Sequence, residues 1–375
     1  MTPTAARNTT LFIGIELSKK EWRLALASGQ KIRQRTVPAG DRQALCTEIA
    51  RAKEKLNLPP DCPVHSCYET GRDGFWIHRL LAQLGVINVV VDAASIEAPR
   101  RGRNAKTDRL DAQKLVRKLI GWCSGDRLVW RVAQVPTAAD EDQRRPHREA
   151  ERLKQERTAH RARIVSLLAL HGVRAKLNAA QRLAPPLESL RDWNGAPLPE
   201  QLRQELQREL ERLALVQEQI VALEQARELW LRQPQTPAQK IAARLLGLRG
   251  VGAVSAWLLA CEFFAWRRFR NRRQVGALSG LCGTPYDSGE GQSEQGISKA
   301  GNKRVRWVMV ELAWSWLRYQ PDSELTHWFW RRFGHGNRRM RRIGIVALAR
   351  KLLVALWKYW ERGELPAGAV LKASV

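Results

Sequence analysis

LFIGIELSKKEWRLALASGQKIRQRTV, residues 11–37, is the stretch that predicts how the first part of the chain folds. Leu11–Leu17 is apolar apart from Glu16, and a short apolar run of this kind is typical of a buried strand. Trp22–Ala27 alternates, and Ile32–Val37 is the third segment with strand character. We therefore expect three successive strands at the start of the chain.

Segments with helix and strand character alternate after residue 40. The pattern predicts a polar helix near residues 41–56, a strand at 64–69, a helix at 74–84 and a buried strand at 86–91. Three early strands followed by strand–helix alternation resemble an RNase H-like α/β sheet. The predicted fold class is therefore α/β in the first part of the chain.

The rest of the chain is predicted to be mainly helical. Residues 136–148 hold two prolines and several acids, and we interpret them as a linker. Residues 149–232 are highly charged and read as helix throughout. Their apolar residues recur every three or four positions, as Leu202, Leu206, Leu210, Leu213, Val216, Ile220 and Leu223. Two antiparallel helices within one subunit and a coiled coil joining two subunits both explain this stripe.

The charge of the chain points to a polyanionic partner. The 375 residues carry 64 Lys and Arg against 37 Asp and Glu, a formal charge of +27. Residues 240–362 contain 23 of these bases and 8 of the acids, so an excess of 15 lies there. Two clusters stand out, Arg267, Arg268, Arg270, Arg272 and Arg273, and Arg338, Arg339, Arg341 and Arg342. This imbalance favours contact with nucleic acid over an ordinary solvated surface.

The sequence gives little support for a membrane or secreted protein. No run of about 18 apolar residues is present, and no signal-peptide core precedes residue 11. The six cysteines are Cys46, Cys62, Cys67, Cys123, Cys261 and Cys282. Their scattered spacing indicates reduced thiols in a cytoplasmic protein better than a zinc site.

AKTDRLDA, residues 105–112, carries two carboxylates three residues apart, Asp108 and Asp111. They share one face if this segment is helical. Glu16 lies inside an apolar strand, where an unpaired charge is costly, and Glu69 ends another strand. Four such acids in a cationic protein suggest a site for Mg²⁺ or Mn²⁺. The alternative is that Glu16 pairs with an arginine and the aspartates cap or decorate a helix.

GLCGTPYDSGEGQSEQGISKAGN, residues 280–302, is the second informative stretch. Its many glycines predict an irregular, flexible loop between helices. Ser288 is the candidate nucleophile in this loop, with Ser293 and Ser298 as competitors. Lys299, Lys303, Arg304 and Arg306 follow closely and could hold an anion there.

Two further motifs have a functional and a structural interpretation. LRGVGAVSA, residues 248–256, could form the hairpin of a helix-hairpin-helix element whose Gly250 and Gly252 approach a phosphate. An ordinary glycine-terminated helix turn explains it equally well. The tryptophans of this region are Trp307, Trp314, Trp316, Trp328, Trp330, Trp357 and Trp360. Their helical spacing favours packing in a core over stacking on bases.

At these residues the chain resembles a known family, the DEDD transposases of insertion-sequence family one-ten, relatives of the Piv DNA invertases. The matching pieces are FIGIELSK, YETG, AKTDRLDA, LRGVGAVSA, GLCGTPYDSG and GISKAGNKRVR. They stand in the family's order and cover roughly residues 11–120 and 240–360. One departure is that the first acid, usually Asp, is Glu16 here. Its extra methylene shifts the carboxylate by about an ångström or more, so the pocket accommodates it or activity falls.

The resemblance implies three parts: a RuvC-like nuclease domain at 1–135, a linker with long helices at 136–239, and a transposase domain at 240–375. It implies that Glu16, Glu69, Asp108 and Asp111 bind the metal and that Ser288 forms a phosphoserine link to DNA. It also implies dimers or tetramers and a structured noncoding bridge RNA that recognises donor and target DNA.

The leading hypothesis is therefore a transposase or site-specific recombinase of a mobile DNA element in the bacterial cytoplasm, associated with the nucleoid. The residues expected at nucleic acid are Lys106, Gly250, Gly252, Arg267, Arg268, Arg270, Arg272, Arg273, Lys299, Asn302, Lys303, Arg304 and Arg306. Two alternatives stay open. One is a metal nuclease of the junction-resolving kind that uses water, and the other is a basic nucleic-acid-binding protein without catalysis.

Overall fold

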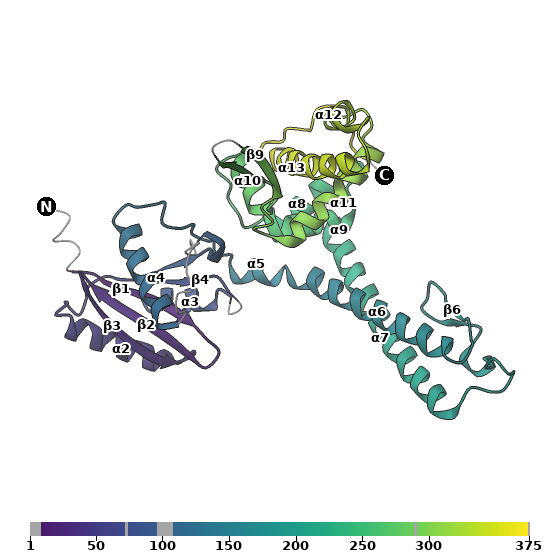
Figure 1. The fold of residues 1–375 in the computed structure, drawn as a ribbon, viewed down its shortest axis with the longest axis horizontal. Helices are drawn as coiled ribbons and strands as arrows, with labels where there is room; N and C mark the ends of the chain where they lie inside the picture. Colours follow the sequence, from purple (N-terminus) through teal and green to yellow (C-terminus); the bar gives the residue numbers. More distant parts are fainter. Residues whose placement is uncertain (1–8, 72–73, 96–107, 289–290, 374–375) are drawn as a thin grey trace. The chain divides into compact units, whose positions relative to one another are not determined.

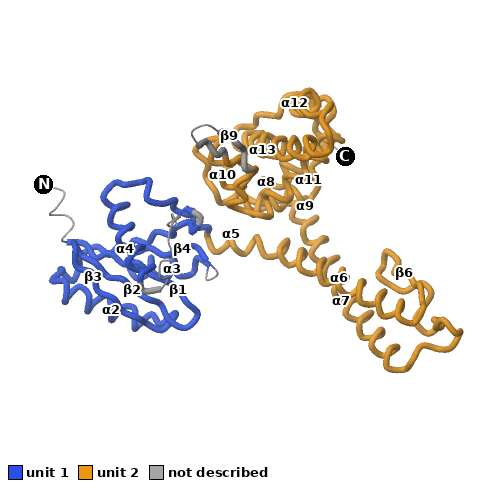
Figure 2. Tube along the Cα trace, in the orientation of Figure 1, with its two compact units in different colours: residues 1–136 blue, residues 137–375 orange. Residues whose placement is uncertain are grey.

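The structure is a computed structural model that describes residues 9–71, 74–95, 108–288 and 291–373. The chain divides into two compact units, residues 1–136 and 137–375 (Figure 2). Buried apolar residues form separate core clusters within each unit. The domain boundary predicted at residue 135 lies one residue before this division. The second boundary, predicted at residue 239, stays a prediction.

The first unit contains a five-stranded mixed sheet in the order β3-β2-β1-β4-β5. Its strands are β1 (Leu11–Leu17), β2 (Glu21–Ser28), β3 (Lys31–Pro38), β4 (Val64–Glu69) and β5 (Ile87–Val91). Its helices are α2 (Arg42–Lys55), α3 (Trp76–Gln83), the short η1 (Ala93–Ser95) and α4 (Asp108–Cys123) (Figure 1). β1, β2 and β3 are antiparallel neighbours, whereas β4 and β5 run parallel to β1. The elements predicted between residues 11 and 91 are confirmed.

Both faces of this sheet are covered, which explains why β1 is apolar at nearly every position. Leu11, Ile13 and Ile15 point to one face, where they share a core with Leu45 of α2 and other residues of α2 and α3. Because side chains alternate along a strand, Phe12 points to the opposite face and packs in the cluster that α4 contributes to. Glu16 is an even number of residues from Phe12 along β1, so its side chain lies on the same face of the sheet, the face that α4 covers.

The second unit is mainly helical. Its first elements are α5 (Ala138–Asp142), α6 (Arg145–Ala169), β6 (Lys176–Leu177), β7 (Leu183–Ala184), η2 (Leu187–Ser189), α7 (Glu200–Arg232), α8 (Pro237–Leu246) and α9 (Ala253–Leu259). They are followed by the π-helix η3 (Ala260–Phe264), α10 (Arg272–Ser279), β8 (Gly283–Ser288), β9 (Gly291–Ile297), α11 (Lys303–Tyr319), α12 (Glu324–Phe333) and α13 (Arg338–Arg362). The predicted layout, α/β followed by mainly α, is therefore confirmed.

The helices α6 and α7 form an antiparallel pair within one chain, which we call the helical arm (Figure 1). Lys154 of α6 binds Glu224 of α7, whereas Arg163, nine residues later, binds Glu209. The later residue of α6 thus binds the earlier residue of α7, which shows that the two helices run in opposite directions. The predicted stripe lies between them, with Leu206, Leu213 and Ile220 fully buried. The intrachain interpretation is thus confirmed.

Glu209 is a buried carboxylate inside the arm. His160 Nδ1 contacts its Oε2 at 2.6 Å, and Arg163 and Arg212 donate to its Oε1 at 2.9 and 2.6 Å. Burial alone would raise the pKa of Glu209, but the hydrogen bonds from these three cation-forming side chains lower it to about 2. The arm therefore holds a charge that is stable only while its partners are in place.

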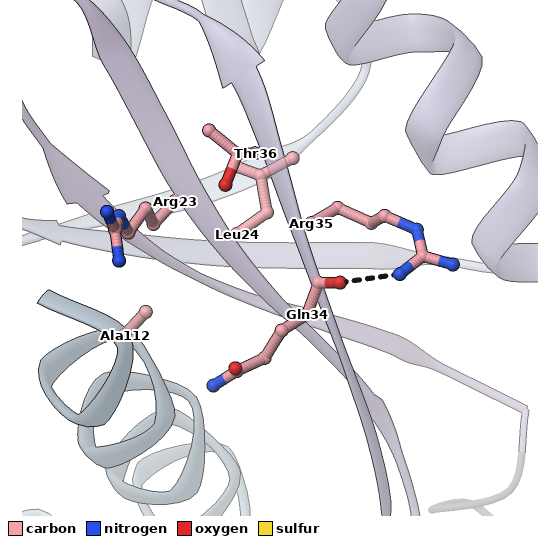
Figure 3. A pocket seen from close by; sticks show the side chains of 6 residues that line it. All are labelled: Arg23, Leu24, Gln34, Arg35, Thr36 and Ala112. Carbon is pink, nitrogen blue, oxygen red and sulfur yellow. Dashed lines mark hydrogen bonds between the residues drawn. The ribbon is translucent and has the colours of Figure 1, made fainter.

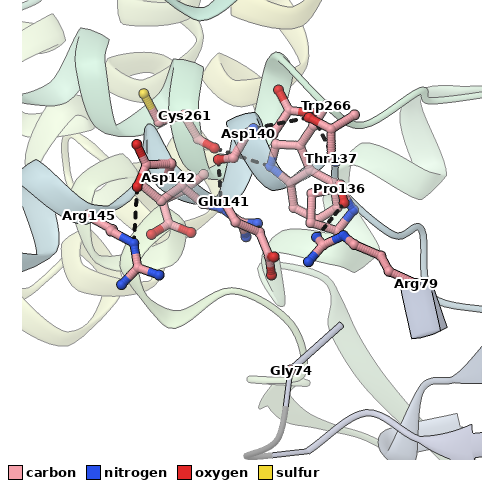
Figure 4. Close-up of polar contacts among 12 residues, drawn as sticks. Gly74, Arg79, Pro136, Thr137, Asp140, Glu141, Asp142, Arg145, Cys261 and Trp266 are labelled. Atoms are coloured by element: carbon pink, nitrogen blue, oxygen red, sulfur yellow. Dashed lines mark hydrogen bonds and ion pairs between the residues drawn. The ribbon is translucent and has the colours of Figure 1, made fainter. Parts of the chain in front are cut away.

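The charged break predicted at residues 136–148 is not irregular, because two helices start within it, and its role as a linker stays a prediction. Thr137 and Asp140 form a reciprocal capping box that starts α5 (Figure 4), with Asp140 N donating to Thr137 Oγ1 at 3.1 Å. Pro146 stands in the first turn of α6, where a missing N–H costs nothing. The acids and prolines that suggested a break are helix-starting signals here.

Residues 170–199 contain no α-helix and only the short 3-10 helix η2, which corrects the prediction of continuous helix from 149 to 232. Gly172 has a φ of +74°, and Pro185, Pro186, Pro197 and Pro199 remove backbone donors that a helix needs. The segment folds into the short β6–β7 ladder and loops at the end of the arm. Its apolar residues Leu183, Leu187, Leu190 and Leu198 share a core with α6 and α7.

The glycine-rich stretch between α10 and α11 is an antiparallel hairpin, not an irregular loop. β8 and β9 pair from Gly283 with Ile297 to Ser288 with Gly291, with an irregularity at Pro285. Gly283 and Gly291 begin the two strands, and Gly296 has a φ of +90°, which only glycine adopts freely. The glycines therefore mark the ends and the irregular point of a hairpin, which we call the serine hairpin (residues 283–297).

Two observations bear on the environment of the chain. Within the ranges that the structure describes, no helix has both the length and the apolar composition needed to cross a membrane. All six cysteines are free thiols, and Cys62, Cys67 and Cys261 are buried.

We expect Glu209→Gln to destabilise the arm at neutral pH by about 2 kcal/mol, because three donors lose a charged acceptor. The folded pKa of Glu209 lies near 2, below its ordinary value of 4.5, so unfolding takes up a proton between these values. The stabilising effect should be complete above pH 4.5 and decline as the pH falls toward 2. Denaturant unfolding of both proteins at a series of pH values measures this, and a difference that grows on acidification would contradict it.

Candidate functional site

Glu16 and Glu69 line one pocket at the carboxyl ends of β1 and β4. The two strands are parallel neighbours, with Ile15 opposite Tyr68, so Glu16 and Glu69 occupy the next positions of the same ladder. The pocket has a volume of about 410 Å³. Its lining is completed by Ile15, Leu17, Ser18, Lys19, Thr70 and Gly71. The structure thus brings together two of the four acids that the sequence singled out.

α4 reaches the same end of the sheet because it crosses β1 at Gly14. A Cβ atom at Gly14 would lie 2.5 Å from the carbonyl oxygen of Ala112 and 2.6 Å from the nitrogen of Val116. At the far end of α4, Cys123 Sγ lies 3.7 Å from Nδ1 of His65, near the start of β4. α4 therefore runs antiparallel to β1, and its N-terminus points toward the carboxyl end.

Asp108 and Asp111 lie in the first turn of α4. Both precede Ala112 by four residues or fewer, so their Cα atoms lie within about 6 Å of that of Ala112 along the helix axis. Asp111 makes an ion pair of 2.9 Å with Lys114. The side chain of Asp108 lies outside what the structure describes, as does Lys106. An acid in the first turn is also favoured by the helix dipole, so the helix-decorating alternative remains open for both residues.

The residue types that line this pocket suit a divalent cation. Carboxylate oxygens are the ligands that Mg²⁺ prefers, and Glu16 and Glu69 present two of them to one pocket. Among the side chains that the structure describes, no group of three His, Cys, Asp or Glu is close enough together to hold a metal ion. The four-carboxylate site therefore stays a prediction.

A second pocket, of about 420 Å³, lies between β2, β3 and α4 (Figure 3). Its lining includes Arg23, Gln34, Thr36 and Ala112. Arg23 is the cross-strand neighbour of Glu16, and its guanidinium binds Glu21 Oε1 at 3.2 Å. One residue of this pocket, Arg23, is thus a strand neighbour of the predicted metal site.

Ser288 is the last residue of β8 and pairs with Gly291 across the serine hairpin. It forms the last pair of the described ladder, whereas Ser293 pairs with Tyr286 inside it. Ser298 lies beyond the hairpin and donates its backbone N–H to the carbonyl of Cys282 at 2.8 Å. The side chains of Ser288 and Ser293 lie outside the described part, so the assignment of the nucleophile stays a prediction.

The turn that follows the hairpin, residues 298–302, is held tightly against the end of α10. A Cβ at Gly301 would lie 2.2 Å from the carbonyl oxygen of Leu278, and a Cβ at Gly280 would lie 2.1 Å from that of Ala300. Both glycines have positive φ angles, of +97° and +70°. Only glycine meets both demands, so the turn and α10 fit together in one way.

Three residues predicted at nucleic acid have partners within the chain. Asn302 caps α11, with Oδ1 accepting from the N–H groups of Arg304 and Val305. Arg304 Nε donates to Glu151 of α6 at 2.7 Å, and Arg306 Nη1 donates to the carbonyl of Lys299 at 2.9 Å. These contacts hold the turn in place, and the predicted contacts with nucleic acid are untested.

Glu262 is a site residue that the sequence analysis missed. It is fully buried in the π-helix η3 and accepts hydrogen bonds from His147, Arg148 and Asn302. Burial would raise the pKa of Glu262, but the hydrogen bonds from His147 and Arg148 outweigh burial and hold it well below its usual range. The signal was available, since Glu262 is a lone acid within an apolar run, as Glu16 is.

The other predicted nucleic-acid residues are mostly exposed. Exposed cationic side chains in this group are Arg268, Arg270, Arg272, Arg273, Lys299 and Lys303. Arg267 is half-buried, and its guanidinium lies 4.2 Å above the ring of Trp266. Gly250 packs against Tyr319 with a φ of +84°, and Gly252 begins α9 in an exposed turn after α8. Two helices joined by a short turn fit both the helix-hairpin-helix and the ordinary-turn interpretation, so the phosphate contact of these glycines stays a prediction.

The seven tryptophans differ in burial. Trp316 and Trp357 are buried in the core of the second unit, and Trp328 and Trp360 pack against it, as predicted. Trp307 and Trp314 of α11 and Trp330 of α12 are 60%, 45% and 48% exposed, so for them the packing interpretation is wrong. Helical spacing alone does not distinguish the buried face of α11 from its outer face.

We expect Gly14→Ala to destabilise the first unit by about 1–3 kcal/mol, because the added Cβ meets backbone atoms of α4 that cannot move independently. Gly121→Ala is the matched control, since its Cβ would meet only a side-chain atom of Val129, at 3.7 Å. The control should be neutral or stabilising by up to about 1 kcal/mol. Equal unfolding midpoints for the two variants would show that α4 does not press on β1.

Comparison with known proteins identifies the family. The sequence model of the family described as "Transposase IS116/IS110/IS902 family" matches residues 242–327. The chain is 40% identical to "Putative transposase y4rJ" of Sinorhizobium fredii, over 99% of this chain and 97% of that protein. It is 30% identical to "Putative transposase y4qE" of the same organism, over 83% of this chain and 72% of that protein.

A third relative is "Transposase for insertion sequence element IS1328" of Yersinia enterocolitica. The identity to that protein is 32%, over 33% of this chain and 37% of the relative. The similarity to the first Sinorhizobium protein extends over nearly the full length of both chains, and the family match falls on the helical second unit. The chain therefore belongs to the IS116/IS110/IS902 family of transposases.

Proposed function

We propose that the chain is the transposase of an insertion sequence and that it cuts and rejoins DNA strands with a metal-binding acidic site and a serine nucleophile. The observation that carries the proposal is the pocket shared by Glu16 and Glu69 at the carboxyl ends of two paired strands. A site of this kind is expected where side chains from neighbouring parallel strands converge. The family membership supplies the reaction class.

The first unit would be the nuclease domain, with an RNase H-like, RuvC-like fold. Supporting this, three antiparallel strands precede two parallel ones, and α4 brings Asp108 and Asp111 toward the end of β1 that carries Glu16. Glu16, Glu69, Asp108 and Asp111 would hold Mg²⁺ or Mn²⁺. A bound divalent ion supplies charge stabilisation to the oxygens around a reacting phosphorus.

Ser288 would attack the scissile phosphate. A new bond forms between Ser288 Oγ and phosphorus, and one phosphorus–oxygen ester bond of the DNA breaks, so that the strand end leaves. The proton lost by Oγ is balanced by the proton that the leaving oxygen takes up. Rejoining reverses these steps with the hydroxyl of a new strand, which explains why strand exchange would need no outside energy source.

The charge distribution supports DNA as the substrate. The exposed arginines at 268–273 and 338–342 lie on the same unit as the serine hairpin and would contact phosphates. We further propose that a structured noncoding RNA guides the choice of donor and target, and that the chain works as a dimer or tetramer. Such an assembly would act in the bacterial cytoplasm, at the nucleoid.

We expect Ser288→Ala to abolish covalent protein–DNA adducts, because the variant has no Oγ to form the link. The reaction contains donor and target DNA, Mg²⁺ and RNA transcribed from the noncoding ends of the element. Adducts are counted on a denaturing gel with labelled DNA.

Ser293→Ala and Ser298→Ala serve as controls and should keep their adducts. An adduct that persists in the Ser288 variant would remove the role from this residue. DNA cleavage without any adduct in the natural protein would instead identify a metal nuclease of the junction-resolving kind.

Replacing Asp108 and Asp111 together with Asn should lower DNA cleavage by at least about 100-fold, because amides are poor ligands for a hard cation. Circular dichroism should be unchanged and the unfolding midpoint should fall only slightly, because Asn keeps the shape of Asp while the favourable interaction of each charge with the helix dipole is lost. Asp61→Asn, an exposed loop residue, is the control for loss of one negative charge. Full cleavage by the double variant would exclude the acidic site from the reaction.

A further inference from the structure

The buried carboxylate of Glu262 lies where three segments of the second unit meet. His147 Nε2 contacts Oε1 at 2.9 Å, Arg148 binds both oxygens at 2.6 and 2.9 Å, and Asn302 Nδ2 donates to Oε2 at 3.0 Å. His147 and Arg148 belong to the first turn of α6, and Asn302 ends the turn after the serine hairpin. One side chain therefore connects the base of the helical arm with the base of the hairpin.

The π-helix explains how an acid reaches this place. Residues 260–264 form a single wide turn after α9, and such a turn changes the direction of the side chains that follow it. The flanking residues Cys261, Phe263 and Phe264 are buried in the apolar core of the unit. A charge in such surroundings is expensive unless each oxygen is bonded, so the three partners must stay in contact with Glu262.

The hydrogen bonds around Asn302 carry this constraint into the hairpin. The backbone N–H of Asn302 donates to Leu278 at 3.1 Å, and that of Lys299 donates to Gly280 at 3.3 Å. Ser298 N–H donates to Cys282 at 2.8 Å, immediately before β8 begins. The end of β9 and the start of β8 are thus tied to the element that Glu262 holds, and the strand register then sets the position of Ser288.

We infer that Glu262 is a positioning residue for the serine hairpin, and that it acts through its hydrogen bond with Asn302. The inference rests on the proposed function, because it takes Ser288 of that hairpin as the nucleophile. Arg304 and Glu151 form a second link between α11 and α6, but their side chains are 28% and 45% exposed. An exposed pair contributes little, so it does not replace the buried contact.

The test exchanges the polarity of the buried hydrogen bond. Asn302→Asp keeps the oxygen that caps α11, because Asp is as good an N-cap as Asn, but it removes the donor and sets a second carboxylate against Glu262. Adding Glu262→Gln supplies an amide donor to that carboxylate and restores the net charge of the cluster. Asn337→Asp is the matched control, since Asn337 caps α13 in the same way and is exposed.

Two measurements are made on the full-length protein. In Asn302→Asp, backbone hydrogen exchange in residues 283–302 should become at least about tenfold faster, because the hairpin loses its anchor. The rate of adduct formation at saturating DNA should fall about 10- to 100-fold, since a shift of about 1 Å in a reacting group costs this much. Because this rate is read at saturating DNA, a change of affinity at Asn302, which is itself predicted to contact nucleic acid, does not affect it. The double variant should recover both rates in part, and Asn337→Asp should match the natural protein.

Hairpin exchange in Asn302→Asp equal to that of the natural protein would overturn the inference, as would a double variant no better than the single one. A loss of DNA affinity with an unchanged rate at saturating DNA would also overturn it, since binding and not positioning would then have changed. If the natural protein forms no adduct, the serine chemistry of the proposed function fails. The exchange measurements then decide the positioning role by themselves.

Discussion

The contact between Gly14 and α4 is the constraint on which the acidic site depends. A helix can lie this close to a strand only where the strand offers no side chain, and the distances of 2.5 and 2.6 Å show that no Cβ fits. The contact fixes the height of α4 over the sheet, and the antiparallel direction of α4 then brings its first turn to the carboxyl ends of β1 and β4. The backbone positions of Glu16, of Glu69 and of the Asp108–Asp111 pair, which come from three distant parts of the sequence, thereby lie toward one end of the sheet.

The second unit uses buried carboxylates in a different way. Glu209 and Glu262 are each surrounded by cation-forming side chains, and in both the hydrogen bonds keep the charged form stable despite burial. Glu209 joins the two helices of the arm, and Glu262 joins the base of the arm to the turn after the serine hairpin. Because a buried charge tolerates few alternative arrangements, these contacts specify how the arm, α9 and α11 pack together.

Much of the fold could be predicted because short-range patterns determine it. The apolar run at β1 and the stripe along α7 identified their elements and their buried faces. The prediction failed where proline or glycine occurs, because each can either interrupt an element or begin one. Pro146 starts a helix instead of breaking one, and Gly283 and Gly291 begin strands. Periodicity alone could not place Glu16 beside Glu69, because their proximity arises from the pairing of β1 with β4; the family resemblance is what suggested a shared site.

The antiparallel arm has a consequence for how such a protein can vary. Both α6 and α7 return to the same base, and the loops of residues 170–199 close only the distant end. Seven residues added to each helix would extend its reach by about 10 Å while keeping the same faces in contact. The length of the arm can therefore change in steps of seven residues per helix. Neither the loops at its distant end nor the contacts at its base beside Glu262 would have to change.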